Sequence, residues 1–225
     1  MVVHFRIFSI FAYPKTNRTG MIHDELRPLL ETIRRLALQV GVRNLSFEKL
    51  KKNPEIQVDL LKKYIHSNEE LVEKTLELER EKFSVIFIEF DFEGMNAIDI
   101  LMIVSKEMAE KFNEISPSIT YELKSLFPEI YRDHFDKRIQ FISDKIRINL
   151  TKGINQGMYR SDLSIELIAR LYISRLIDLH NPDFFPPEAF SFSTLFDQMF
   201  ESFIRSVGTP EGLAYYDQKR KTVKF

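Results

Sequence analysis

The stretch VGVRNLSFEKLKKNPEIQVDLLKKYIHSNEELV, residues 40–72, decides the fold of this 225-residue chain. Gly41 ends a helix whose apolar residues recur at helical spacing from Ile22 onward. Ser46 is placed to cap a short helix that runs toward Asn53, and a further short helix is predicted over residues 57–65. The stretch therefore predicts three helices in close succession, the last two joined by a tight turn.

A fourth, longer helix follows directly. Ser67 and Glu70 form a capping box, in which each residue satisfies a free backbone N–H at the start of a helix. A helix, two short crossed helices and a long helix are the layout of a helix-turn-helix module. In such a module the second short helix enters the major groove of DNA, and the first crosses the backbone.

The rest of the chain reads as helices separated by Gly, Pro and Ser. The segment FSVIFIEFDF (83–92) is rich in residues that favour strands, but we assign its first half to the long helix because no partner strand is visible. Further helices are predicted over about 96–112, 117–127, 128–151, 164–180 and 193–207, with a solvated tail after Gly208. The fold class is therefore all-α, with about nine helices and little or no sheet.

Composition narrows the class of protein. The formal net charge is −1 and cysteine is absent, which excludes disulfides and thiolate metal sites and fits a cytoplasmic location. No apolar run approaches the roughly 20 residues that span a bilayer. We expect residues 1–21 to be an N-terminal extension, a candidate for disorder, with the organised chain starting at Met21.

Residues 40–72 resemble, without gaps, the N-terminal domain of tetracycline-repressor (TetR) family transcription regulators. The positions that carry the resemblance are Gly41, Val42, Leu45, Ser46, Phe47, Leu50, Ile56, Leu61, Tyr64, Glu70, Leu71 and Val72. The segments GINQGMYRSDLSIELIARLYISRLIDL and FFPPEAFSFSTLFDQMFESFIRSV are similar to the regulatory domain of a Bacteroidetes-type branch of that family. The resemblance covers about residues 22–213.

The resemblance implies a helix-turn-helix domain over 22–70, a ligand-sensing and dimerising domain over 71–213, and a tail over 214–225. It implies a homodimeric, ligand-responsive repressor that binds a double-stranded DNA operator and needs no cofactor. The residues expected to contact DNA are Arg43, Ser46, Lys51, Lys52, Gln57, Val58, Lys62, Lys63, Tyr64 and His66. For the lysines an ordinary solvated face is the alternative, and for Tyr64 it is packing in the small helical core.

The helix-turn-helix departs from the family pattern at its turn and at its reading helix. The family's usual Gly in the turn is replaced by Glu55, preceded by Pro54, which we expect to shorten the first short helix. Asp59 places a negative charge where phosphates would lie. Residues 21–72 hold nine basic and eight acidic residues, so the local charge alone does not predict tight DNA binding.

The downstream helices offer a ligand pocket and a dimer interface. Residues expected to line a pocket for a small apolar ligand are Phe87, Phe90, Ile100, Ile103, Val104, Tyr121, Phe127, Tyr131 and Phe141, with plain core packing as the alternative. Residues expected to form a four-helix dimer interface are Leu167, Leu171, Leu176, Leu195, Phe196, Met199 and Phe203.

The sequence also bears on two other classes of function. A TetR-fold dimeric module that binds a ligand or a protein but has lost operator binding would explain Pro54, Glu55 and Asp59. We expect no enzyme, because the sequence holds no phosphate loop, nucleophile elbow or paired catalytic carboxylates. We also expect no metal site, because the histidines are scattered without the spacing of ligands.

Overall fold

The computed structural model describes residues 22–112, 117–179, 181, 183–186 and 188–222. Within these ranges the regular structure consists of ten α-helices, one short 3-10 helix and an isolated β-bridge between Tyr159 and Gly208. The expected all-α fold class is confirmed. The helices are α1 (Arg27–Val40), η2 (Val42–Asn44), α2 (Phe47–Leu50), α3 (Val58–Tyr64), α4 (Asn68–Glu89), α5 (Ala97–Phe112), α6 (Pro117–Leu126), α7 (Pro128–Asn155), α8 (Ile165–Asp178), α9 (Phe192–Val207) and α10 (Pro210–Thr222).

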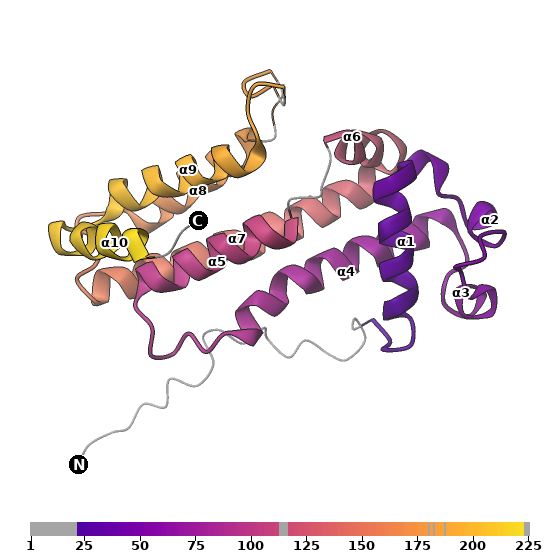
Figure 1. Ribbon diagram of the computed structural model, residues 1–225, viewed down its shortest axis with the longest axis horizontal. Helices are drawn as coiled ribbons and strands as arrows, with labels where there is room; N and C mark the ends of the chain where they lie inside the picture. Colours follow the sequence, from indigo (N-terminus) through magenta and orange to yellow (C-terminus); the bar gives the residue numbers. More distant parts are fainter. Residues whose placement is uncertain (1–21, 113–116, 180, 182, 187, 223–225) are drawn as a thin grey trace, which may run out of the picture.

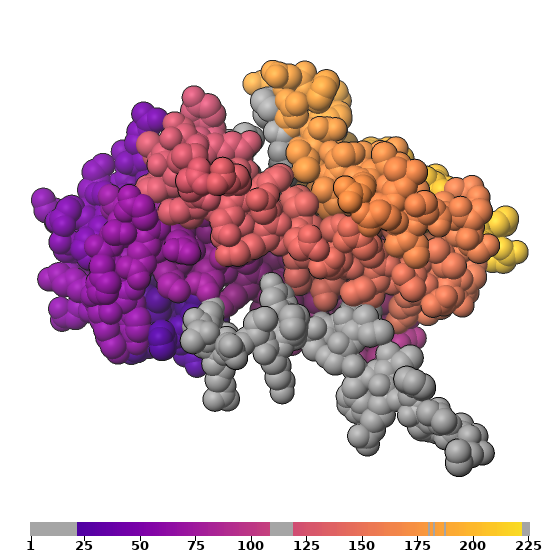
Figure 2. Space-filling model, turned by 180° about the vertical axis from the view of Figure 1, so that it is seen from behind, coloured from indigo at the N-terminus to yellow at the C-terminus, as the bar shows by residue number. Residues whose placement is uncertain are grey.

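The two longest helices, α4 and α7, run along the length of the molecule (Figure 1). Helices α1, α2 and α3 lie at one end, and α8, α9 and α10 lie at the other (Figure 1). The space-filling view from behind shows the same separation, with the indigo N-terminal helices and the orange C-terminal helices at opposite ends (Figure 2). Helix α7 packs against α4, α5, α6 and α8, so it is the element that joins the parts of the molecule.

Two main apolar cores match this division. One core lies among α1, α2, α3 and the first half of α4, and includes Leu30, Leu50, Leu61 and Ile65, all nearly or fully buried. The other lies among α4, α5, α7, α8, α9 and α10 and is rich in aromatic rings. A small third cluster, which includes Val42 and Leu123, joins the N-terminal helices to α6. Each core consists of apolar side chains that its helices bury together, and this burial is the main contribution to the stability of each end of the molecule.

Side-chain caps fix where several helices begin. The hydroxyls of Ser67, Ser164 and Ser191 each accept a hydrogen bond from the backbone N–H three residues on, at the starts of α4, α8 and α9. The first half of 83–92 is helical, as expected, because α4 continues to Glu89. The last predicted helix, expected from about residue 193, begins at Phe192, with Ser191 as its cap.

The chain after Gly208 is a helix, α10, and not the solvated tail that we expected. Its Tyr216 is 2% exposed and belongs to the larger core. Arg205 and Arg220 form ion pairs that tie α10 to α9, with Asp217 and Glu201 as their partners. The segment has few apolar residues, among them Leu213, Tyr215 and Tyr216, so no helical pattern of apolar residues marks it in the sequence. The expected extension over residues 1–21 lies outside the described residues. None of the helices in the described part is long and apolar enough to cross a membrane.

Candidate nucleic-acid interface and ligand cavity

Helices α2 and α3 form a compact head on α1 and the start of α4. Leu50 anchors α2, and Leu61 and Ile65 anchor α3 in the shared core, where all three are at most 1% exposed. One half of the capping box expected at the start of α4 is present, since the Glu70 N–H donates to the Ser67 hydroxyl at 3.1 Å. The Glu70 carboxylate in turn accepts from the His66 N–H at 2.8 Å, which fixes the passage from α3 into α4.

The turn between α2 and α3 is built by Asn53 and Pro54 without a glycine. The Ile56 N–H donates to the Asn53 carbonyl at 3.1 Å, and the Glu55 N–H donates to the Asn53 side chain at 2.9 Å. Asn at the first position and Pro at the second are what a four-residue turn favours. As expected, α2 is short and ends at Leu50. The Glu55 carboxylate pairs with Arg35 of α1, which holds the turn against the head.

Helix α3 presents a polar outer face. Gln57, Asp59, Lys62 and Lys63 are exposed on it, and Val58 is half-buried. Asp59 lies in the first turn, where its charge favours the helix dipole but opposes an approaching phosphate. The face therefore carries both signs of charge.

Several of the side chains expected to contact DNA interact with acidic residues of the protein itself. The Lys63 ammonium pairs with Glu25 at 2.6 Å, and the Tyr64 hydroxyl donates to the same carboxylate. Lys51 pairs with Glu48 at 2.5 Å and lies over the Phe47 ring. By contrast, Lys52 and Lys62 are exposed and make no ion pair with any residue that the structure describes. The side chains of Arg43 and His66 are also exposed, and Ser46 is half-buried because its hydroxyl caps α2.

The backbone at Gly41 and Arg43 is in contact with α6. The Arg43 N–H donates to Glu122 at 2.9 Å. Gly41 has φ +82° and ψ 155°, a conformation nearly exclusive to glycine, and a Cβ there would lie 3.0 Å from the Glu122 carboxylate. Gly41 can be identified from the sequence as a helix stop, but Glu122 cannot be identified as its neighbour, because the two lie 81 positions apart.

A large cavity of about 910 Å³ lies among α4, α5, α6, α7, α8 and α9. Of the residues expected to line a ligand pocket, it brings together Phe87, Ile100, Val104, Tyr121 and Tyr131. Phe141 lines a second, smaller cavity, and Phe90, Ile103 and Phe127 line neither of the two. Three cationic side chains, Lys124, Arg138 and Lys145, line the large cavity beside its aromatic rings, and the sequence analysis did not single them out.

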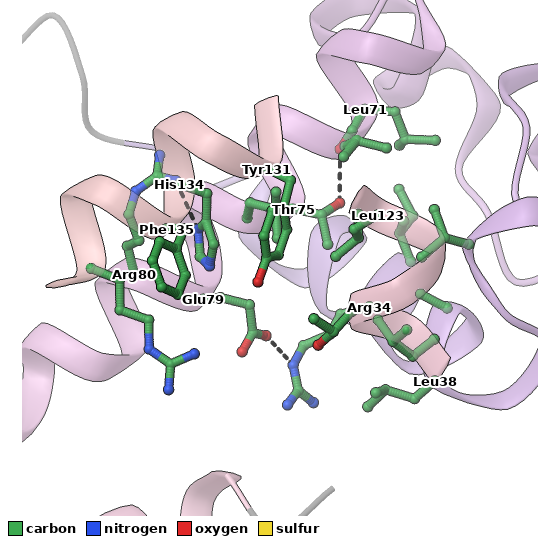
Figure 3. Close-up of a pocket in the computed structure, with 18 of the residues that line it drawn as sticks. Arg34, Leu38, Leu71, Thr75, Glu79, Arg80, Leu123, Tyr131, His134 and Phe135 are labelled. Carbon is green, nitrogen blue, oxygen red and sulfur yellow. Dashed lines mark hydrogen bonds and ion pairs between the residues drawn. The ribbon is translucent and has the colours of Figure 1, made fainter. Parts of the chain in front are cut away.

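The smaller cavity, about 140 Å³, lies where α1, α4, α6 and α7 meet (Figure 3). There the Arg34 guanidinium of α1 pairs with the Glu79 carboxylate of α4. Figure 3 shows this ion pair below the rings of Tyr131, His134 and Phe135. Burial, together with the charges of Arg80 and Arg138, lowers the pKa of His134 to about 3. The neutral ring can then accept a hydrogen bond from Arg80, whose Nη1 lies 3.0 Å from Nδ1.

The expected dimer residues divide into two groups. Leu167 and Leu171 of α8 are 55% and 46% exposed. Leu176 and Leu195 are half-buried and line the large cavity. Phe196, Met199 and Phe203 are buried in the core of their own chain, with Phe203 against the Tyr172 ring, and so do not lie on the open face that we expected. The apolar spacing of α9 could not distinguish an inward face from an outward one.

Among the described residues, no group of three or more His, Asp or Glu side chains could hold a metal ion. The protein therefore has a small head that exposes the polar helix α3, and a largely apolar cavity among helices α4 to α9.

Comparison with known proteins is informative only at the level of structure, since no family model and no curated protein matches the chain. A Rhodococcus sp. protein assigned to the TetR-family regulators matches with a TM-score of 0.63 at 16% identity, over 83% of this chain and 100% of its own. Reduced NemR of E. coli matches with a TM-score of 0.60 at 16% identity, over 82% and 98%. A TetR-family regulator from Agrobacterium tumefaciens matches with a TM-score of 0.58 at 16% identity, over 80% and 96%. At these identities the similarity establishes the architecture alone: the chain has a TetR-like fold.

Proposed function

We propose that this protein is a ligand-responsive, DNA-binding transcription regulator that acts as a homodimeric repressor. The observation that carries the proposal is the exposed face of α3, whose inner residues Leu61 and Ile65 are buried in the head. A helix held in this way can enter a major groove without unfolding its own core. Residues 22–70 are then the reading head, and 71–213 the sensing and dimerising part.

Lys52 and Lys62 are the best candidates for phosphate contacts, because no acidic side chain in the described structure neutralises them. Gln57 precedes α3 and is exposed, so its amide is placed to read a base edge. Lys63 and Tyr64 could contact DNA only after their interactions with Glu25 were broken. We therefore propose that the α3 contacts come mainly from Gln57, Lys62 and the turn.

Helix α6 supplies a physical link between the large cavity and the reading head. Its Thr120, Tyr121 and Lys124 line the cavity. The next residue along from Tyr121, Glu122, binds the Arg43 N–H in the head. A ligand that moves α6 would therefore change the position of the head, and by linkage DNA would change the affinity for that ligand.

The experiment is fluorescence anisotropy of the full chain with duplex DNA from its own upstream region, at low and moderate salt. A preferred sequence and an affinity that falls steeply with salt support the regulator, because phosphate contacts release counterions. A second candidate, a TetR-fold module without operator binding, is favoured by Asp59 on α3 and by the capture of Lys63 and Tyr64 by Glu25. No binding of any duplex at low salt would favour that module.

A further inference from the structure

The large cavity combines apolar walls with an excess of positive charge. Among the residues that the structure describes, its charged lining consists of the cations Lys124, Arg138 and Lys145 and one carboxylate, Asp178, which is exposed. Lys145 lies over the rings of Phe87 and Phe141, at 5.0 and 5.2 Å from the ring centroids. Burial lowers the pKa of Lys145. A cavity of this composition favours a molecule with an apolar body and a negative charge.

Arg138 is the cation that most requires a partner. It lies on α7 and lines both cavities. Its guanidinium makes no hydrogen bond or ion pair within 4.0 Å with any side chain that the structure describes. Burial lowers the pKa of Arg138, whereas Tyr131 and Glu79 act to raise it. Arg138 is half-buried, and leaving the five N–H donors of a guanidinium unsatisfied away from water is costly.

The nearby acidic group is already engaged. Glu79 uses one carboxylate oxygen to accept from Arg34, and its second oxygen is buried without a hydrogen-bond partner among the described residues. Arg80 donates instead to the neutral ring of His134. The one carboxylate whose charge acts on Arg138 is thus paired with Arg34, and Arg138 makes no ion pair of its own with any described residue.

We propose that the large cavity binds an amphipathic carboxylate, with Arg138 binding the carboxylate and the apolar walls of α4, α5 and α7 enclosing the apolar body. This inference rests on the proposed ligand-binding role of the cavity. A guanidinium matches a carboxylate through two parallel N–H···O bonds, which an alcohol cannot form. The cavity would therefore select for charge as well as for size.

The test is isothermal titration calorimetry of the full chain at about pH 7.5 with decanoate, 1-decanol and decylamine, which share one chain length and differ in head group. At that pH a carboxylate is ionised. We expect decanoate to bind at least about tenfold more tightly than decanol, since its bonds to arginine are charge-assisted, and decylamine to bind most weakly. Arg138→Met should bring decanoate to within about threefold of decanol and leave decanol unchanged, because only the charged contact is lost.

Two further variants separate recognition from folding. Arg138→Lys keeps the charge without the two-pronged geometry and should retain part of the preference for decanoate. Arg132→Met, an exposed arginine on the same helix, should change nothing. Circular dichroism establishes that each variant is folded.

Three results would overturn the proposal. Equal affinity for decanoate and decanol in the unaltered protein removes the role of charge but leaves an apolar ligand site. Equal loss of both ligands in a folded Arg138→Met protein makes Arg138 a shaping residue only. If none of the three compounds binds, the cavity is not a ligand site, and the ligand-responsive part of the proposed function is wrong. DNA binding is measured in a separate experiment, so its outcome does not depend on this one.

Discussion

Gly41 shows at the scale of one residue how the head is joined to the body. Its backbone conformation strains any residue that has a Cβ, and a Cβ there would lie 3.0 Å from the Glu122 carboxylate. We predict that Gly41→Ala lowers the free energy of unfolding by about 1–3 kcal/mol, from backbone strain. Urea denaturation followed by circular dichroism measures this. Gly94→Ala is the control, since a Cβ there meets nothing within 4 Å, and an equal loss in both variants would contradict the explanation.

His134 gives the molecule a specific dependence on pH. Its pKa is about 3 in the folded protein, below the ordinary 6.5, because burial and two arginines disfavour the charged ring. Between about pH 3 and pH 6.5 the unfolded chain binds a proton at His134 that the folded chain does not. The stability that comes from keeping this ring neutral is therefore present above about pH 6.5 and is lost as pH falls toward 3. We expect the group to cost about 2 kcal/mol of stability between about pH 7.5 and pH 5.

The check is to compare urea denaturation of the unaltered protein and of His134→Gln at both pH values. The variant should lose less stability on acidification, because glutamine does not titrate. His66→Gln, at an exposed histidine, should behave like the unaltered protein. Parallel pH slopes for all three proteins would show that His134 is not held neutral by the fold.

At the scale of elements, helix starts could be predicted from the sequence better than helix faces. Ser46 and Ser67 cap the helices for which they were named, because capping is a local property of the chain. The inward face of α9, which buries Phe196, depends on where α5 and α8 lie, and no local pattern records that. Glu122 and Arg138 could not be identified from the sequence for the same reason. The backbone that Glu122 contacts, and the helices that form the cavities around Arg138, lie far away along the chain.

Helix α3 carries a charge that works against its proposed role. We predict that Asp59→Asn raises the affinity for duplex DNA by about threefold to tenfold at low salt, because a negative charge leaves the face that meets phosphates. Lys62→Ala should weaken binding and reduce the salt slope by about one. Both are measured by anisotropy over a salt series.

The matched control for Asp59→Asn is Glu211→Gln, which removes an acidic residue from the first turn of α10, at the other end of the molecule. It changes the net charge by the same amount but should leave DNA affinity unchanged. If both substitutions raised the affinity equally, total charge and not the α3 face would govern binding. Asp59→Asn should also destabilise α3 slightly, by about 0.3–1 kcal/mol, since Asp59 favours the helix dipole.

At the scale of the whole molecule, a DNA-reading dimer needs an open apolar face, and α8 offers one. Leu167 and Leu171 lie one helical turn apart and remain 55% and 46% exposed, whereas Ala169, Tyr172 and Ile173 of the same helix are buried. We propose that this outer face of α8 meets the same face of a second copy, a self-complementary contact. The pair of reading heads would then follow the two-fold symmetry of a palindromic operator.

We therefore predict that the double variant Leu167→Glu with Leu171→Glu weakens self-association by at least about tenfold, because charges that face their own copies repel and lose apolar contact. Analytical ultracentrifugation over a concentration series measures this. The fold of each chain should survive, since both leucines are exposed within it. Ile88→Glu is the control, because Ile88 is 73% exposed on α4, away from α8. A dimer that persists in the double variant, or that is lost equally in Ile88→Glu, would place the contact elsewhere on the molecule and would require another geometry for the two heads.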